Sequence, residues 1–472
     1  MVFSSVFFLF VFLPITLAGY YVLRGKARNY WLLLVSLIFF SWSQPQYAVL
    51  IFCSIFLNYL SGLLVELLAP RCWSKCVLIL ALLVNIGILF YFKYYNFTVT
   101  TFNSLFQTQI TLKEIILPIG ISFFTFQGMS YVVDVFRRRV SAQKNIAKVG
   151  LYIALFPQLI AGPIVRYQDI AEEIDRRSVN ISDFCDGIER FIIGLSKKAI
   201  IANSMALTAD AVWSNAENGN LPAVAWIGSI AYTLQIYYDF SGYSDMAIGL
   251  GQMFGFHFRE NFNLPYLSRN ISEFWRRWHI SLSSWFKDYV YIPLGGNRRH
   301  VYRNLILVFF LTGLWHGAAW NFILWGFLNG ILIILERFWR TREKKLHTDD
   351  QSGIKNVVGH LYTLLAVNIG WILFRAPTLH EAWLFLKSMF GFFIPATPGF
   401  DTWWYLDRWT VTMMILGIFF ATSFPGRVRH LILPARKPLR LCLKYTALLL
   451  LFALSIFRIV AGTYNPFIYF QF

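Results

Sequence analysis

The sequence predicts an all-α protein that crosses a membrane many times. Of its 472 residues, 57% are apolar and only 14% are charged, whereas soluble globular proteins carry about 25% charged residues. A water-soluble chain of this length would lack the polar side chains needed to cover its exterior. Aromatic residues make up 19% of the chain, which excludes an intrinsically disordered protein because such chains are poor in aromatics.

Apolar runs of helical length recur along the whole chain. A spanning helix needs about 20 apolar residues, so we expect roughly 10–13 transmembrane or re-entrant helices. The candidate spans are 3–22, 30–50, 51–68, 77–97, 115–136, 151–164, 188–207, 224–238, 304–335, 357–374, 410–424 and 445–460. The second run is interrupted at 41–46, where a kink or a re-entrant bend is expected. Pro157, Gly162 and Pro163 break the run at 151–164, and irregular backbone at membrane depth must lie against protein or a wet cavity. The middle of the chain is therefore expected to line a cavity.

Basic residues outnumber acidic ones, 42 to 24, which gives a formal charge of +18. They form short clusters between apolar runs, as in the cytoplasmic loops of membrane proteins, and this interpretation is favoured over nucleic-acid binding. With the first residues outside and the clear spans alternating, 22 basic residues fall in inside loops and four in outside loops. The inside loops are 24–29, 69–76, 137–148, 337–355 and 427–444, and the outside loops are 98–114 and 375–408. Both termini are therefore predicted to be extracytoplasmic, with orientation through 150–300 left open.

An ionisable residue inside an apolar run is costly and marks a functional hypothesis. His316 lies in LTGLWHGAAWNFILWGFLNG, residues 311–330, directly after Trp315 and five positions before Asn321. Burial lowers the pKa of an imidazole, so a neutral His316 could accept a proton near pH 7. Small neighbours such as Gly313 and Gly317 would let a ligand approach the backbone closely. The alternative is a helix-packing histidine hydrogen-bonded to a backbone carbonyl.

Residues 266–300 combine regularly spaced aromatic residues with basic ones. Apolar residues three and four positions apart predict one aromatic face of a single helix. This face contains Trp275, Trp278, His279, Leu282, Trp285 and Phe286. Arg276 and Arg277 point elsewhere, as in an amphipathic helix at a membrane surface. The segment is either a surface anchor or a place where the arginines meet the phosphates of a donor cofactor, and the two interpretations are compatible.

Two carboxylates interrupt the apolar stretch YYDFSGYSDMAIGLG, residues 237–251. Asp239 and Asp245 are each expected to be buried and paired, with Arg276 or Arg277 as candidate partners, or to lie near water in a cavity. Structural pairing is favoured for at least one of them. The other could orient an imidazole.

Several common catalytic motifs are missing. The sequence has no serine nucleophile elbow, Walker loop, HExxH pair or dinucleotide fingerprint. The five cysteines are scattered, so we expect no metal site. A histidine that can act as a base, with no nucleophile motif nearby, favours direct transfer of a group onto an acceptor hydroxyl. No linker separates soluble parts, so residues 1–472 are expected to form one membrane domain, with a catalytic segment at 266–336.

The same segments resemble the membrane-bound O-acyltransferase (MBOAT) family, and within it the bacterial alginate O-acetyltransferase-like branch. The likeness covers nearly the whole chain. It includes MVFSSVFFLFVFLPI at 1–15, LPIGISFFTFQGMSYVVDVFR at 117–137, FPQLIAGPIVRY at 156–167, YYDFSGYSDMAIGLG, ENFNLPYLSRNISEFWRRWHISLSSWFKDYVYIPLGGNR at 260–298, LTGLWHGAAWNFILWG at 311–326 and NPFIYFQF at 465–472.

The resemblance implies helices arranged around a central funnel, in a bacterial inner membrane. His316 matches the family's catalytic histidine. His279, in the WRRWH segment, matches the family's second histidine. By analogy, the donor is acetyl-CoA or another acyl thioester that enters from the cytoplasm as a substrate, with no permanently bound cofactor. The acceptor waits on the far side, and a partner protein with an extracytoplasmic domain completes O-acetylation of a polysaccharide of the alginate, cellulose or peptidoglycan type.

These implications assign expected roles to the polar residues. His316 is the expected general base and His279 a helper base or donor-positioning group. Asn321 or an indole N–H such as that of Trp315 could stabilise the oxyanion. Asp239, Asp245, Arg276 and Arg277 are expected to support substrate binding. The alternatives are a transporter or flippase of a lipid-linked saccharide, which also needs polar residues around a cavity, and a non-catalytic scaffold that holds a partner enzyme.

Overall fold

The structure is a computed structural model that describes residues 1–42, 44–345, 353–393, 401–425, 437–462 and 467–468. Within these residues the regular elements are helices. Six helices are long and apolar enough to cross a membrane, namely Pro45–Leu67, Cys72–Phe106, Ile181–Trp213, Trp320–Trp339, Gly353–Arg375 and Pro438–Ala461. Shorter apolar helices cover Phe8–Val22, Ala27–Ser41, Ile121–Phe136, Val301–His316 and Arg408–Phe420. The expected all-α polytopic membrane fold is confirmed.

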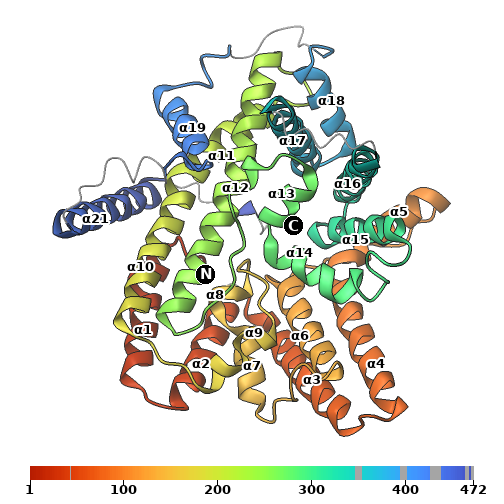
Figure 1. The fold of residues 1–472 in the computed structure, drawn as a ribbon, viewed down its shortest axis with the longest axis vertical. Helices are drawn as coiled ribbons and strands as arrows, with labels where there is room; N and C mark the ends of the chain where they lie inside the picture. Colours follow the sequence, from red (N-terminus) through yellow and green to blue (C-terminus); the bar gives the residue numbers. More distant parts are fainter. Residues whose placement is uncertain (43, 346–352, 394–400, 426–436, 463–466, 469–472) are drawn as a thin grey trace. The chain divides into compact units, whose positions relative to one another are not determined.

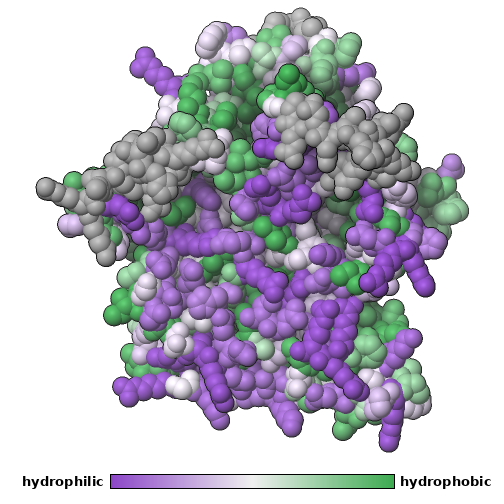
Figure 2. Space-filling view, viewed as in Figure 1, coloured by the Kyte–Doolittle hydropathy of each residue, from purple (hydrophilic) through white to green (hydrophobic). Residues whose placement is uncertain are grey.

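Large apolar side chains face outward on these helices. On α4 (Cys72–Leu89), Ile79, Leu80 and Leu83 are 47%, 63% and 61% exposed, and hydrophobic surface over this helix is visible in Figure 2. A soluble monomer rarely exposes contiguous apolar patches of this kind. Such a surface suits contact with lipid tails, as expected for a multi-pass membrane protein.

The chain divides into two compact units. One comprises Met1–Phe191 and Tyr243–Arg259, and the other comprises Ile192–Gly242 and Glu260–Phe472. Helices α10 (Ile181–Ser196) and α12 (Pro222–Met253) each contribute residues to both units. The single membrane domain and its central funnel stay predictions.

Small residues and buried amides hold the helices of the first unit together. Its elements, besides parts of α10 and α12, are η1 (Phe8–Phe12), α1 (Leu13–Val22), α2 (Ala27–Ser41), η2 (Pro45–Tyr47), α3 (Ala48–Leu67), α4, η3 (Phe90–Tyr94), α5 (Tyr95–Phe106), α6 (Ile121–Phe136), α7 (Ile146–Ala154), α8 (Phe156–Leu159) and α9 (Tyr167–Asp175). Between α3 and α4, Asn58 and Asn85 exchange two amide hydrogen bonds of 3.3 and 3.1 Å. Gly128 of α6 lies so close that a Cβ there would meet Asn58 Nδ2 at 2.4 Å. Such contacts are typical of helix packing in membranes.

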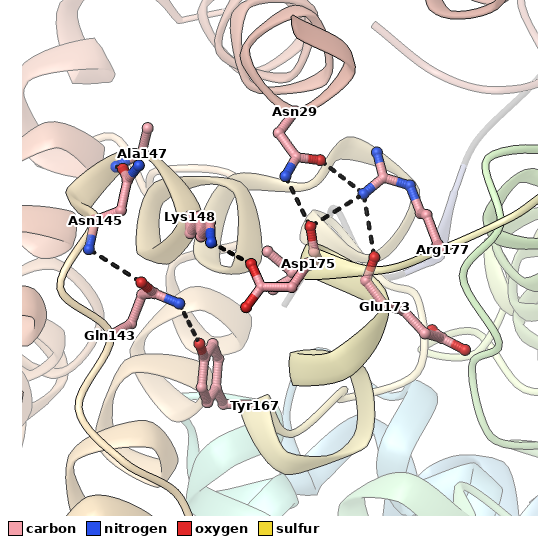
Figure 3. A network of polar contacts seen from close by, with 10 residues as sticks. Asn29, Gln143, Asn145, Ala147, Lys148, Tyr167, Glu173, Asp175 and Arg177 are labelled. Carbon is pink, nitrogen blue, oxygen red and sulfur yellow. Dashed lines mark hydrogen bonds and ion pairs between the residues drawn. The ribbon is translucent and has the colours of Figure 1, made fainter. Parts of the chain in front are cut away.

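A polar network ties α2, α7, α9 and the chain beyond α9 to one another (Figure 3). Asn29 donates its Nδ2 hydrogen to the Ile174 carbonyl at 2.8 Å, and Arg177 Nη1 donates to Asn29 Oδ1 at 2.6 Å. Lys148 and Asp175 form an ion pair whose side chains are 23% and 45% exposed. The network links α2 and α7 to the C-terminal end of α9 through side-chain contacts.

The second unit carries both histidines of interest. Its further elements are η4 (Lys197–Ala202), α11 (Asn203–Trp213), η5 (Pro265–Leu267), α13 (Ile271–Arg277), α14 (Ile280–Phe286), η6 (Lys287–Tyr291), α15 (Val301–His316), α16 (Trp320–Lys345), α17 (Gly353–Arg375), α18 (Leu379–Met389), α19 (Arg408–Phe420) and α21 (Lys437–Ala461). Helix α16 packs against both α15 and α17 (Figure 1). This packing positions the C-terminal end of α15, where His316 lies.

Several expected spans have different boundaries in the structure. The run 304–335 is two helices, α15 and α16, because the chain turns at 317–319. The run 30–50 ends at Ser41, and α3 starts afresh at Ala48 after Pro45, which confirms the interruption expected there. The run 151–164 forms the end of α7 and the short α8 instead of one span. Parts of the basic loops 337–355 and 427–444, and of the motif at 465–472, lie outside the described residues.

Candidate active site

His316 is the last residue of α15 and is only 3% exposed. Its ring centroid lies 4.9 Å from that of Trp315, 5.1 Å from that of Trp325 and 5.1 Å from that of Phe374. The Trp325 ring stands at 90° to the imidazole. The imidazole is therefore enclosed by aromatic rings, which limits its contact with water.

Glycines bring α15 and α16 into direct backbone contact. A Cβ at Gly313 would stand 2.4 Å from the Phe322 carbonyl oxygen, and one at Gly326 would stand 2.3 Å from that of Phe309. A Cβ at Gly317 would meet the Phe322 ring at 2.2 Å. The expectation that Gly313 and Gly317 let a ligand approach is therefore wrong, because these positions are taken by α16.

His279 lies at a break between α13 and α14, not within one helix. Its backbone is left-handed, with φ 43° and ψ 53°, and Trp278 before it is extended. The expectation of a single amphipathic helix is therefore wrong. The aromatic face was nevertheless identified correctly, because all six of its residues are buried.

Asn261 explains why the chain breaks at this point. Its backbone carbonyl accepts the Ile280 N–H at 3.0 Å, and its side-chain Oδ1 accepts the Ser281 N–H at 3.2 Å and the Ser281 hydroxyl at 2.8 Å. The two N–H groups are among those that a helix leaves unsatisfied at its N-terminus. Asn261 therefore caps α14 from a distant part of the sequence and fixes the break beside His279.

The same amide oxygen of Asn261 determines which ring nitrogen of His279 carries the proton. The distance from His279 Nδ1 to Asn261 Oδ1 is 3.1 Å. Because Oδ1 can only accept, Nδ1 carries the proton, and Nε2 is the basic atom of the neutral ring. His279 lies outside the candidate spans, and burial lowers its pKa to about 3. The ring is neutral at physiological pH.

The two histidines and Trp315 come together in the fold. The His279 and His316 ring centroids are 6.4 Å apart, and that of Trp315 lies 5.8 Å from that of His279. Phe240 of α12 stands edge-on to His279 at 4.6 Å. Two imidazoles within one aromatic enclosure can accept and relay a proton with little competition from bulk water.

Asn321 is close in sequence to His316, but its side-chain amide forms hydrogen bonds with the backbone of another helix end. Its Nδ2 donates to the carbonyl oxygens of Ala376 at 2.8 Å and Leu373 at 3.4 Å, at the C-terminal end of α17. The residue thus joins α16 to α17. Its role as an oxyanion donor stays a prediction.

Asp239 and Asp245 form ion pairs with partners other than those expected. Asp239 Oδ1 lies 2.6 Å from Lys198 Nζ, and its Oδ2 accepts the Ile468 N–H at 2.8 Å. Asp245 pairs with Arg190 at 2.9 Å. The expectation of pairing with Arg276 or Arg277 is wrong, because the lysine and arginine that pair with the two carboxylates are both supplied by the segment 181–202.

The adjacent arginines lie in different surroundings. Arg277 binds Glu273 one helical turn before it, with its Nη2 at 2.9 Å from Oε1. Arg276 instead lines a cavity of about 400 Å³ between α13, α14, α15 and α16. Other residues of this cavity are Trp275, Lys287, Phe309, Thr312 and Arg337. The cavity therefore has an apolar interior and three basic side chains along its walls.

Three residues of the site were not identified from the sequence. Lys198 lies in the apolar run 188–207, so the argument that singled out His316 would also have found it. Asn261 and Trp325 gave no such signal, because an asparagine in a polar loop and a tryptophan in an apolar helix are both ordinary.

Comparisons with known proteins bear on this site. The family profile described as "MBOAT, membrane-bound O-acyltransferase family" matches residues 88–375. The chain is 39% identical to the "Probable alginate O-acetylase AlgI" of Pseudomonas putida, and the alignment covers 100% of both proteins. It is 38% identical to the "Peptidoglycan O-acetyltransferase" of Helicobacter pylori, with 83% of this chain and 80% of that protein aligned. A likeness of 28%, over 56% of this chain and 70% of the relative, extends to the "Teichoic acid D-alanyltransferase" of Bacillus subtilis.

Proposed function

The chain belongs to the membrane-bound O-acyltransferase family, in its alginate O-acetylase-like branch, and on this premise we propose that it moves an acetyl group from a cytoplasmic thioester to an extracytoplasmic polysaccharide. It is an O-acyltransferase, so the transporter interpretation is set aside. His316 is the general base in this proposal, and His279 supports it.

The observation that carries the proposal is the pairing of His316 with His279 in one aromatic enclosure, 6.4 Å apart. His316 takes the proton of the acceptor hydroxyl as its oxygen attacks the thioester carbonyl. The C–O ester bond forms, the C–S bond breaks, and the proton passes from the imidazole to the departing thiolate. General-base catalysis of this kind contributes about 10²–10⁴-fold, and exclusion of water protects the thioester from hydrolysis.

The cavity bounded by Arg276, Lys287 and Arg337 supports a phosphate-bearing donor. Guanidinium groups bind phosphate oxygens in paired geometry, and lysine adds a point charge. The distribution of basic residues among the loops predicts that Arg337 lies at the cytoplasmic end of α16, where acetyl-CoA is available. Acetyl-CoA is therefore the proposed donor, bound as a substrate, with its phosphates at these three side chains.

The acceptor is proposed from the relatives. Their names specify alginate and peptidoglycan, which are both polysaccharides outside the cytoplasm. In this proposal a partner protein with an extracytoplasmic domain completes the transfer to the polymer. We place the chain in a bacterial inner membrane with both termini extracytoplasmic.

Cells that carry His316→Ala test the proposal. The acetyl-ester content of the exported polysaccharide should fall toward the level of a strain without this gene, because the transfer loses its general base. Membrane insertion and protein amount are measured in the same cells. His360→Ala is the matched control, since the Nδ1 atom of His360 contacts the Ser268 carbonyl oxygen at 3.1 Å, away from His316, and it should leave ester content unchanged. Normal acetylation in the His316→Ala strain would remove this residue from the mechanism.

A further inference from the structure

An apolar cavity of about 390 Å³ lies between α12, α17 and the end of α19, apart from the donor cavity. Leu234, Leu364 and Ala421 line it, and Leu234 and Ala421 are only 4% and 5% exposed. Neither His279 nor His316 is among the described residues that line it. The cavity is therefore distinct from the proposed site of acyl transfer.

The cavity opens onto the outer surface of the helices around it. Ile230, Leu365 and Ile418 also line it and are 37%, 45% and 54% exposed. Leu365 belongs to α17, which is long and apolar enough to cross a membrane. The rim is thus continuous with an apolar surface of the kind that suits contact with lipid tails. A hydrocarbon chain can enter the cavity directly from the bilayer.

The polar side chains of the cavity wall are hydrogen-bonded within the protein. Asn368 accepts a hydrogen bond from Ser229 at 2.7 Å and donates one to Thr233 at 2.9 Å. The Tyr266 hydroxyl donates to the Thr233 carbonyl at 2.7 Å, and His360 Nδ1 lies 3.1 Å from a backbone carbonyl oxygen. The remaining polar wall residues donate to backbone carbonyls, namely Trp226 and Thr422. A wall whose polar groups are already paired favours an apolar occupant, and an empty cavity would cost stability because its lining lacks packing partners.

Two basic side chains lie just beyond the His360 end of the cavity. Arg269 Nη1 donates to Asn356 Oδ1 at 3.0 Å, and Asn356 lies one helical turn before His360 on α17. Lys355 precedes Asn356, and both basic residues are exposed. A guanidinium has five N–H donors, so Arg269 can bind phosphate oxygens beside its contact with Asn356. The distribution of basic residues predicts that this end of α17 faces the cytoplasm, on the side where anionic lipids attract such residues.

We propose that the cavity holds one acyl chain of an anionic phospholipid whose phosphate lies at Arg269 and Lys355. Asn356, beside these cations, and Asn368, in the cavity wall, are 12 residues apart, which is about 18 Å along α17. This length is close to the depth of one leaflet, since the hydrocarbon core of a bilayer is about 30 Å thick. The inference goes beyond acyl transfer and does not depend on it.

Lipid binding to the delipidated full chain in detergent tests this site. The probes are a phosphatidylglycerol, which is anionic, a phosphatidylcholine with the same acyl chains, which is zwitterionic, and decane, which has no headgroup. Native mass spectrometry counts the bound lipids, and thermal melting reports the stabilisation. The wild-type protein should bind phosphatidylglycerol more tightly than phosphatidylcholine, and decane should stabilise it less than either.

Three variants separate the two parts of the site. Ala421→Phe places a ring inside the cavity and should abolish phospholipid binding there. Leu364→Trp fills the same space from α17 and should have the same effect. Arg269→Gln should weaken phosphatidylglycerol binding about tenfold, the value of one hydrogen bond to a charged group, and remove the advantage over phosphatidylcholine. This exposed substitution leaves the cavity unchanged.

Ile415→Phe is the matched control, because it adds the same ring to α19 at a residue that is 62% exposed and does not line the cavity. It should bind lipid as the wild type does. Unchanged phosphatidylglycerol binding in the folded Ala421→Phe and Leu364→Trp proteins would overturn the site. Equal binding of the two phospholipids, or equal stabilisation by decane, would overturn the anionic phospholipid as its occupant. His316→Ala should bind lipid normally, so this result is independent of the catalytic proposal.

Discussion

Each unit of the molecule contains a Lys–Asp pair, and the two pairs differ sharply in their surroundings. Lys148 and Asp175 of the first unit are 23% and 45% exposed and belong to the hydrogen-bonded network of Figure 3. Lys198 and Asp239 of the second unit are 4% and 2% exposed, and Phe240, the residue after Asp239, contacts His279. Solvent screens the charges of the first pair, whereas the second pair is almost completely removed from water. The same kind of ion pair thus lies in a hydrated local network in one unit and in a buried core in the other.

The largest expected effect on stability comes from breaking the buried pair. Lys198→Met leaves the Asp239 carboxylate without its counter-ion and should lower the free energy of unfolding by about 3–5 kcal/mol. Denaturation of the purified protein in detergent measures this. The double variant Lys198→Met with Asp239→Leu should recover most of the loss, because it leaves no buried charge. A single variant as stable as the wild type would show that the pair is hydrated after all.

A smaller effect is expected from acid, through His279. Its folded pKa of about 3 lies below the ordinary value of 6.5. Between these values the unfolded chain binds more protons than the folded one, so stability should fall as pH drops below 6.5, by at most about 1.4 kcal/mol per pH unit. His279→Asn should flatten this slope in melting curves recorded from pH 7 to pH 4. Equal slopes in the two proteins would contradict the buried, neutral imidazole.

The smallest effect is expected from the exposed pair. Lys148→Met should change the free energy of unfolding by about 0–1 kcal/mol, since solvent screens both charges. Measured beside Lys198→Met, it isolates burial as the cause of the difference between the two pairs. A loss as large as that of the buried pair would mean that the network in Figure 3 holds the first unit together.

The sequence was sufficient to predict the helical membrane fold, and it singled out two histidines that the fold brings close together, for a physical reason. Long apolar runs and isolated polar residues within them are local signals, so His316, Asp239 and the interruption before α3 could be found one segment at a time. The partners of the polar residues could not be found in this way, because they are distant in sequence. Lys198 and Asp239 are 41 positions apart, and Asn261 and His279 are 18 positions apart. A periodic aromatic face also could not reveal the break at His279, since the residues on both sides of it are buried alike.

The central claim is that His316 accepts the proton of the acceptor hydroxyl while acetyl leaves its thioester. Inverted membrane vesicles from cells expressing the protein expose the cytoplasmic face, so labelled acetyl-CoA can be supplied there and alkali-labile ester followed over time. Wild-type vesicles should form labelled ester, and His316→Ala vesicles with the same amount of inserted protein should form it about 10²–10⁴-fold more slowly. Ester formation at the wild-type rate in the His316→Ala vesicles would contradict the mechanism.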